Sequence, residues 1–187
     1  MKLYLTRHGE TVWNVEKRLQ GWMDSPLTEK GIKGAEKLRD RLKNEGIDYI
    51  YSSDLKRAVS TAEIIRDDSK IEIELLEDLR EIKFGDWEGM VLQDVKNQFP
   101  HEYNIYLSNP KEYNLISGEN IEELFERAYK ALDFIVSRGH ERVLIVSHGV
   151  TIRAIIAILM NVPYERFKDI PVYAGTSLSV FEGESKT

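Results

Sequence analysis

The sequence contains no cysteine among its 187 residues. This excludes disulfide bonds, thiolate metal sites and a cysteine nucleophile, and it fits the reducing cytoplasm, where we expect the protein to act. Long hydrophobic runs are lacking too, because the longest, Ala154 to Met160, is far too short to cross a bilayer. The mostly apolar start from Met1 to Leu5 meets Arg7 almost at once and is too short for a signal peptide. We therefore expect no membrane partner.

Positively charged residues are fewer than negatively charged ones. Lys and Arg number 26 against 32 Asp and Glu, which gives a formal net charge of −6. No basic stripe of the kind that binds nucleic acid emerges, so we expect no nucleic-acid partner. If this acidic chain handles an anion, its positive charge must be gathered at one place.

The length and the apolar pattern predict the fold. A chain of 187 residues without linker, repeat or low-complexity stretch is predicted to form a single domain, 1–187. Short apolar runs alternate with apolar residues at helical spacing, which is typical of an α/β protein. We predict a three-layer α/β/α sandwich with a largely parallel central sheet. Its strands are expected at residues 3–5, 47–51, 71–76 (at a sheet edge), 143–146 and 178–181.

Helices are predicted from caps and apolar faces at residues 28–46, 52–65, 121–139 and 149–160. Thr28 is expected to cap the first helix, and residues 52–54 form a capping cluster for the second. Ile32 and Val136 are assigned to the buried faces of their helices. The segment from about 90 to 117 is the least regular, and we interpret it as helix plus loop in a lid-like insertion.

Two turns of the chain resemble each other. Residues 3–9 and 144–149 are both apolar strands that end in His-Gly, with the histidines at positions 8 and 148. Ligands of open α/β sheets bind outside the carboxyl ends of the strands, so both side chains are expected to face one crevice. Gly9 and Gly149 would let the backbone approach a ligand closely. Either histidine alone is better explained as an unrelated surface residue, but together they favour a shared site.

Arg57 is expected at the same edge of the sheet, in the first turn of the helix that follows the second strand. A helix start attracts anions, and the guanidinium fork matches phosphate oxygens. The alternative is a solvated Arg57 that pairs with Glu63 or Asp54. Arg7 beside His8 favours the first interpretation, because two arginines and two histidines would gather positive charge locally.

Taken in order, the motifs of the chain resemble those of the histidine phosphatase superfamily, in its phosphoglycerate-mutase-like branch. They are similar to the broad-specificity phosphatase and alpha-ribazole phosphatase members, and they extend from residue 7 to residue 149. The matching residues are Arg7-His8-Gly9-Glu10-Thr11, Trp13-Asn14, Gly21, Pro26-Leu27-Thr28 with Gly31, Ser52-Ser53-Asp54-Leu55, Arg57-Ala58, Leu79-Arg80-Glu81, Gly85, Trp87-Glu88-Gly89, Gly118-Glu119 and Ser147-His148-Gly149.

The resemblance implies a phosphoglycerate-mutase-like fold and a metal-independent phosphatase that acts on a small-molecule phosphate ester without a cofactor. It implies that His8 is the nucleophile, that Glu81 donates a proton, and that Arg7, Arg57 and His148 hold the phosphate. It also places substrate contacts at Asn14, Gln20, Gly21 and Gly149.

These residue types suit the reaction. A neutral imidazole is a competent nucleophile near pH 7, and its attack on phosphorus gives a phosphoramidate that water can open. Arg7, Arg57 and a protonated His148 would balance the charge of the transferring group. The alternative to a role of Glu81 in acid–base catalysis is a salt bridge with Arg80 or Lys83.

Other functions remain open at this point. A metal-dependent hydrolase could use His8, His148 and a carboxylate, although His101 and His140 fall in segments predicted to be peripheral. A non-catalytic phospho-ligand-binding relative is a further possibility. A cofactor-dependent phosphoglycerate mutase is the closer alternative, but mutases resemble longer chains with an inserted arginine pair, and residues 81–126 contain no arginine. Five aromatic and apolar residues of this stretch would either form an apolar lid over the site or pack against the core: Phe99, Tyr103, Tyr106, Tyr113 and Leu115.

Overall fold

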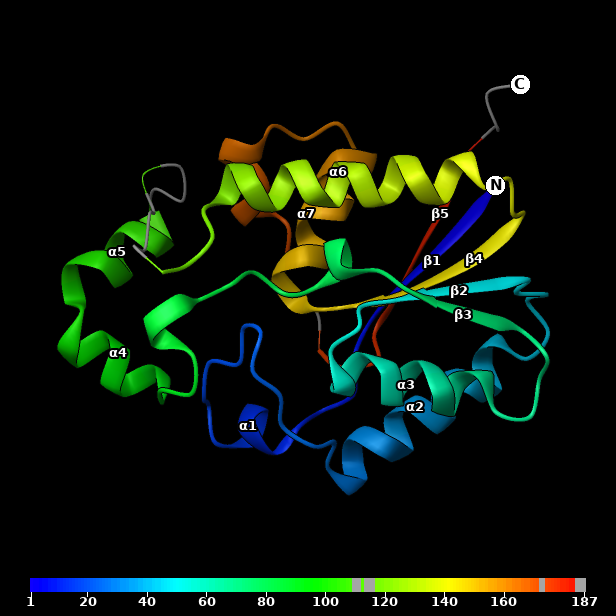
Figure 1. The fold of residues 1–187 in the computed structure, drawn as a ribbon, viewed down its shortest axis with the longest axis horizontal. Coiled ribbons are helices and arrows are strands. Elements are labelled where there is room, and N and C mark those ends of the chain that lie inside the picture. The colour runs from blue at the N-terminus through cyan, green and yellow to red at the C-terminus, as the bar shows by residue number, and fades with distance from the viewer. Residues whose placement is uncertain (109–111, 113–116, 172–173, 184–187) are drawn as a thin grey trace.

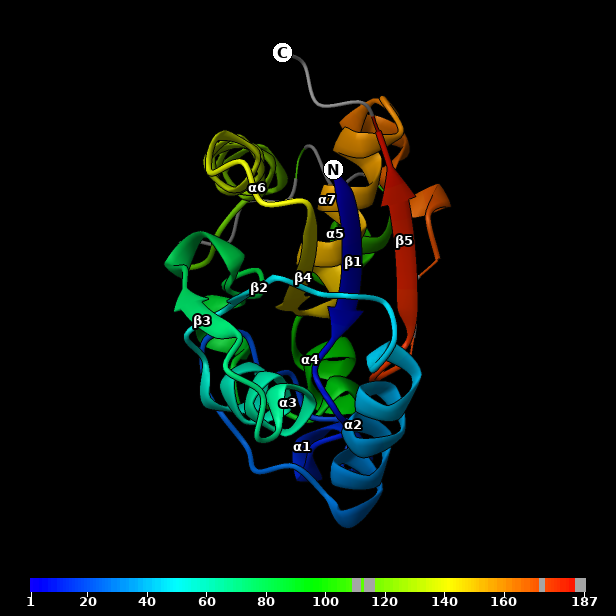
Figure 2. The same cartoon turned by 90° about the vertical axis from the view of Figure 1, so that its right-hand side faces the viewer.

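The computed structural model describes residues 1–108, 112, 117–171 and 174–183. Its centre is a five-stranded sheet with the strand order β3-β2-β4-β1-β5. The first four strands in this order are mutually parallel, and β5 runs antiparallel to β1, as Figure 2 shows. The strands are β1 (Lys2–Arg7), β2 (Tyr49–Ser52), β3 (Glu72–Leu75), β4 (Arg142–Ser147) and β5 (Leu178–Glu182).

Helices cover both faces of this sheet. Helices α2 and α3 pack on one face and α6 and α7 on the other, which confirms the predicted α/β/α sandwich (Figure 1). The α-helices are α1 (Val12–Val15), α2 (Glu29–Leu42), α3 (Lys56–Arg66), α4 (Leu92–Gln98), α5 (Pro100–Ser108), α6 (Ile121–Ser137) and α7 (Gly149–Leu159), and the 3-10 helices are η1 (Glu77–Leu79), η2 (Gly85–Trp87) and η3 (Tyr164–Asp169).

Local signals account for most helix boundaries. The Thr28 side chain accepts a hydrogen bond from the Gly31 N–H at 3.0 Å, so it caps α2 as predicted. Helix α2 ends at Leu42 rather than at Gly46, which adopts a positive φ of 70° in the following turn. Ile32 and Val136 were assigned to buried faces, but both are exposed, because each lies at the solvent edge of its helix.

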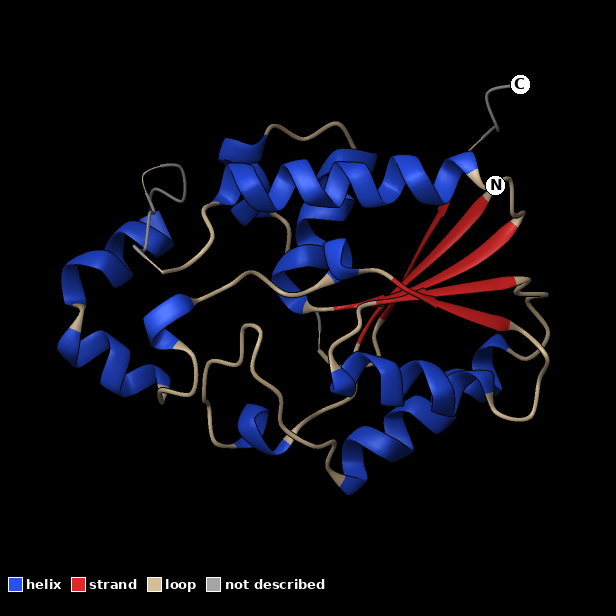
Figure 3. Ribbon diagram, in the orientation of Figure 1, coloured by secondary structure: helices blue, strands red, loops and turns tan. Residues whose placement is uncertain are grey.

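Helices α4 and α5 lie beyond the carboxyl ends of the parallel strands (Figures 1 and 3). The rings of Phe99, Tyr103 and Tyr106 each lie 6.2 to 6.3 Å from the Trp87 ring, measured between centroids. These three side chains therefore pack against the buried core around Trp87. Tyr113 and Leu115 lie outside the described residues.

The helices of the described ranges are all too short or too polar to cross a membrane.

Candidate active site

The carboxyl ends of β1, β4 and β2 lie side by side at the centre of the sheet. Arg7 pairs with Ser147, and Ser52 with Val146, so the residues that follow each strand emerge together. The rings of His8 and His148 are 5.2 Å apart between centroids. The two histidines are therefore neighbours at the carboxyl edge of the sheet, as expected.

His8 is almost fully buried, and one of its ring nitrogens has a fixed role. Its Nδ1 lies 2.7 Å from the carbonyl oxygen of Gly9. A carbonyl oxygen only accepts hydrogen bonds, so Nδ1 carries the proton and Nε2 keeps its lone pair. Burial, followed by the charges of Arg57 and Arg7, lowers the pKa of His8 well below its ordinary value. His8 is thus a neutral imidazole at pH 7 with Nε2 as a potential nucleophile.

Gly9 has a different reason for being glycine than the one expected. A Cβ at this position would lie 2.7 Å from the Gly31 carbonyl oxygen in α2, and the φ of Gly9 is not positive. Its N–H donates to Thr61 Oγ1 at 3.0 Å. The backbone at Gly9 therefore lies close to helix α2. Gly149 is the first residue of helix α7.

His148 is fully buried, and its Nε2 lies 2.8 Å from the Ser53 hydroxyl oxygen. Its Nδ1 has no hydrogen-bond partner within the part of the chain that the structure describes. Burial, followed by the charge of Arg57, lowers the pKa of His148 well below its ordinary value. The expectation of a protonated His148 is therefore wrong for the free site, because burial disfavours the cation.

The two buried histidines predict a pH-dependent stability. Both are neutral in the folded protein, whereas in the unfolded chain they bind protons below a pKa of about 6.5. The unfolded state then holds more protons, so the free energy of unfolding falls as the pH drops below about 6.5. Each histidine contributes up to about 1.4 kcal/mol per pH unit. Denaturant unfolding between pH 7.5 and pH 5 measures the slope of the free energy of unfolding against pH.

The matched variants for this measurement are His148→Gln and His140→Gln, since His140 lies outside the site and stacks on Tyr49. We expect a smaller slope for His148→Gln and an unchanged slope for His140→Gln. Equal slopes in all three proteins would contradict the prediction.

Arg57 is held by the preceding loop. Its Nη1 donates to Asp24 Oδ1 at 2.8 Å and to the Met23 carbonyl oxygen at 2.7 Å, and its Nη2 donates to the Gly21 carbonyl oxygen at 2.7 Å. The Nε atom is buried without a hydrogen-bond partner among the described residues. Burial lowers the pKa of this guanidinium, and Asp24 opposes that effect. Arg57 remains a cation, because the delocalised guanidinium keeps its proton in proteins.

The ion-pair partner of Arg57 is Asp24, and not Glu63 or Asp54, the two partners suggested from the sequence. Asp24 also accepts the N–H groups of Lys56 and Arg57, at 2.9 and 3.3 Å, and so caps helix α3. The predicted capping cluster 52–54 is therefore wrong: Ser53 binds His148, and Asp54 pairs with Arg80. Asp24 is 33 residues from Arg57, and no local sequence signal pairs the two.

Replacing Asp24 by asparagine is expected to lower kcat/KM for a phosphate ester by about 10²-fold, because Arg57 loses the carboxylate that orients it. Steady-state kinetics measures the loss. Asp40→Asn serves as the control, since Asp40 is an exposed residue of α2 that pairs with Arg39. A normal kcat/KM for Asp24→Asn would show that its ion pair does not orient Arg57.

Arg7 brings the second positive charge to the site. It ends β1, directly before His8, and its charge is one cause of the lowered pKa of both histidines. Burial lowers the pKa of Arg7 itself, while the nearby Glu81 raises it. The acidic chain therefore concentrates two arginine cations around two neutral histidines.

Glu81 faces the start of helix α7. Its Oε1 accepts hydrogen bonds from the backbone N–H groups of Ile82, Val150 and Thr151, at 3.0, 3.1 and 3.2 Å. The alternative salt bridge with Arg80 is wrong, because Arg80 binds Asp54 with its Nε at 2.7 Å. Lys83 instead lies over the Trp22 ring. Glu81 thus lies at the helix N-terminus that follows His148.

The three predicted contact residues of the N-terminal loop are Asn14, Gln20 and Gly21, and of these Gly21 binds Arg57 with its carbonyl oxygen. Thr11 joins two of them: its N–H donates to Asn14 Oδ1 at 3.0 Å, and its hydroxyl donates to Gln20 Oε1 at 3.1 Å. Gly21 has a positive φ of 51°, and a Cβ there would collide with the Glu88 side chain. The acceptor atoms of Asn14 and Gln20 therefore hold the loop whose carbonyl oxygens bind Arg57.

Within the described ranges, no three His, Asp or Glu side chains are grouped so that they could hold a metal ion. The His140 ring stacks on the Tyr49 ring, with 4.0 Å between the ring centroids. Tyr49 is the first residue of β2, so His140 is far from the carboxyl edge of the sheet.

Known proteins resemble this chain in fold and in sequence. The family model of the histidine phosphatase superfamily (branch 1) matches residues 3–187. The chain belongs to this superfamily. Among solved structures, it resembles Bacillus stearothermophilus YhfR with a TM-score of 0.94 and 41% sequence identity, over 100% of this chain and 93% of the other.

Two further relatives have names that state an activity. The alpha-ribazole phosphatase from Shigella flexneri has a TM-score of 0.91 and 28% identity, over 100% of this chain and 92% of the other. Phosphoglycerate mutase-like protein 4 of Arabidopsis thaliana is 35% identical, over 96% of this chain and 78% of the relative. The chain is thus a superfamily member of phosphatase type, similar to proteins with phosphatase and mutase-like names.

Proposed function

We propose that this protein hydrolyses small phosphate monoesters, with His8 Nε2 as the nucleophile that takes the phosphoryl group and passes it to water. One observation carries this proposal. The hydrogen bond from Nδ1 to the Gly9 carbonyl oxygen leaves the Nε2 lone pair available in a neutral ring, beside two arginines. Such a ring can attack phosphorus without first losing a proton.

The reaction has two steps. In the first, Nε2 of His8 forms a bond to phosphorus, the ester P–O bond breaks, and Glu81 donates a proton to the departing alkoxide. In the second, water attacks phosphorus, the P–N bond breaks, and Glu81 takes a proton from the water. Inorganic phosphate leaves, and both residues return to their initial state.

Positive charge and N–H donors stabilise the transferring phosphoryl group. Arg7 and Arg57 supply fixed cations, which suits a reaction that depends on electrostatics and positioning. In the tautomer in which the Ser53 hydroxyl donates to Nε2 across their contact of 2.8 Å, His148 Nδ1 carries the proton and would donate it to a phosphate oxygen. The N–H of Gly149, first in α7, would bind another oxygen.

Substrate contacts outside the phosphate are proposed for Asn14, Gln20 and Gly21, of which Gly21 binds Arg57 through its carbonyl oxygen. The segment 90–117 is proposed to cover the leaving group within a single-domain protein. Tyr106 of α5 supports this role, because burial, followed by the charge of Glu81, raises its pKa. This tyrosine is therefore near the proposed proton donor.

Trapping the intermediate tests the proposal. A ³²P-labelled ester mixed with the enzyme and quenched within milliseconds should leave label on the protein that is lost in acid and stable in alkali. Peptide mapping should place the label on His8. Turnover without any labelled protein at the shortest times would show direct transfer to water.

Phosphoglycerate mutation is the second candidate, and one observation favours it. The stretch 81–126 lacks arginine, but Arg153 of α7 is close enough to Tyr106 and Glu81 for their charges to interact. A substrate carboxylate could therefore find its cation on α7. Incubation with 3-phosphoglycerate, with and without 2,3-bisphosphoglycerate, separates the candidates: hydrolysis releases inorganic phosphate, whereas a mutase forms 2-phosphoglycerate and depends on the primer.

We expect EDTA to leave the activity within about twofold of its initial value, since arginines would supply the charge that a metal ion supplies in other phosphoryl-transfer sites. Activity before and after chelation and dialysis measures this. Loss of activity that a divalent cation restores would favour the metal-dependent hydrolase.

A further inference from the structure

The backbone of Leu79, Arg80 and Glu81 is held by side chains from outside its own segment. This segment begins at the last residue of η1 and belongs to no strand. The carbonyl oxygen of Leu79 accepts from the Ser147 hydroxyl at 2.7 Å, that of Arg80 from the Thr151 hydroxyl at 2.7 Å, and that of Glu81 from Trp22 Nε1 at 2.9 Å. Because no strand pairing holds this segment, the position of Glu81 depends on these side-chain hydrogen bonds.

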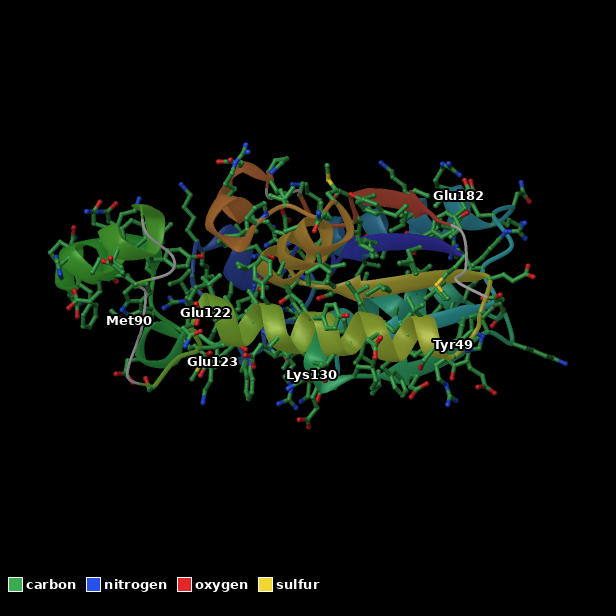
Figure 4. The ribbon with its side chains drawn as sticks, turned by 90° about the horizontal axis from the view of Figure 1, so that it is seen from above. Tyr49, Met90, Glu122, Glu123, Lys130 and Glu182 are labelled. Atoms are coloured by element: carbon green, nitrogen blue, oxygen red, sulfur yellow. The ribbon has the colours of Figure 1, made fainter. Side chains whose placement is uncertain are left out.

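One side chain contributes more of these bonds than any other. Arg127 of α6 donates from Nη1 to the carbonyl oxygens of Asp78 and Arg80, at 2.9 and 2.6 Å. Its Nη2 donates to the carbonyl oxygen of Glu81 at 3.1 Å. A single guanidinium thus fixes the chain on both sides of the Glu81 peptide. Figure 4 labels Glu122 and Glu123 in the first turn of this helix.

Glu119 fixes Arg127 in turn. Its carboxylate binds Arg127 at two points, Nε at 2.5 Å and Nη2 at 2.7 Å, and both side chains are 11% exposed. The same carboxylate accepts the Lys83 N–H at 3.2 Å, and the Glu119 N–H donates to the Lys83 carbonyl oxygen at 2.8 Å. The pair therefore holds residues 78–83 as one unit.

We propose that Arg127 and Glu119 are positioning residues that set the Glu81 carboxyl for proton transfer. The inference rests on the proposed function of Glu81. The carboxyl binds the start of α7, whereas its backbone binds α6 through Arg127, so Glu81 is fixed between two helices. A buried ion pair adds little stability over an apolar pair, so orientation is its main contribution here. A proton donor displaced by about 1 Å loses about 10²-fold in rate.

Leaving groups provide the test. An alkoxide such as that of glycerol 3-phosphate needs a proton to depart, whereas 4-nitrophenolate does not. For Arg127→Lys, which keeps the charge but loses the fork, we expect kcat to fall about 10- to 10²-fold on glycerol 3-phosphate. On 4-nitrophenyl phosphate we expect a change of less than about threefold. Glu119→Gln should show the same pattern to a smaller extent.

Arg138→Lys is the matched control, because Arg138 is the exposed residue that follows α6 and stacks on Phe134. It should leave both rates unchanged. In a Glu81→Gln background, Arg127→Lys should have no additional effect on glycerol 3-phosphate, since the proton donor is already absent.

Two results would overturn the inference: an equal loss on both esters, or an additive double variant. If Glu81→Gln alone shows no dependence on the leaving group, the proposed role of Glu81 fails, and the positioning role fails with it. If Glu81→Gln behaves as expected and Arg127→Lys does not, only the positioning role is lost.

Discussion

Replacing His8 by asparagine is expected to lower kcat for every phosphate ester by about 10⁴- to 10⁶-fold, as for other nucleophile deletions. The amide has no lone pair on nitrogen that could bond to phosphorus, so the covalent intermediate cannot form. No labelled phosphoenzyme should appear in rapid-quench experiments. The phosphate site should persist, because Arg7 and Arg57 take their positions from β1 and from the loop that ends at Asp24.

Equilibrium binding separates this explanation from misfolding. Calorimetry should show that the His8→Asn variant still binds vanadate or inorganic phosphate within about tenfold of the wild-type affinity. His140→Asn should retain full activity, because this histidine stacks on Tyr49 outside the site. Label that persists in His8→Asn would assign the nucleophile to another residue.

Replacing Glu81 by glutamine is expected to lower kcat by about 10²- to 10⁴-fold on alkyl phosphates, the range of other general acids. Glutamine can still accept the N–H groups of Val150 and Thr151, so the local structure should be kept. It cannot give a proton to the alkoxide. The deficit should therefore shrink on 4-nitrophenyl phosphate, whose leaving group departs as an anion.

Glu77→Gln is the control for this variant, because Glu77 is a 77% exposed residue of the same segment that pairs with Arg80. It should change neither rate by more than about twofold. Equal losses on alkyl and nitrophenyl esters for Glu81→Gln would instead assign Glu81 a structural role or a role in holding phosphate.

The meeting of the two histidines could be predicted from the sequence, because parallel strands end at one edge of a sheet. His8 follows β1 and His148 follows β4, and these strands are neighbours. Thr28 was also predictable, since a cap is read from three residues of chain. The role of Gly9 was not, because the Gly31 carbonyl oxygen that excludes a Cβ belongs to a helix 22 residues further on.

The contacts that prepare the site depend on groups distant in the chain. Asp24 orients Arg57 across 33 residues, and Val150 binds Glu81 across 69. Arg127 reaches the carbonyl oxygen of Arg80 across 47. A composition or spacing rule cannot choose among the many carboxylates and arginines that could form such pairs. Only the packing of loops and helices against the sheet selects them.

The sequence by itself determined the succession of the five strands and the four helices α2, α3, α6 and α7 along the chain, and the two His-Gly turns that meet at one edge of the sheet. The tertiary structure decided their charge and direction. The histidines are neutral because surrounding atoms exclude water from them, and His8 presents the Nε2 lone pair because its Nδ1–H donates a hydrogen bond to the Gly9 carbonyl oxygen. Burial and hydrogen-bond geometry arise only when distant segments pack together, and for that reason the sequence did not reveal them.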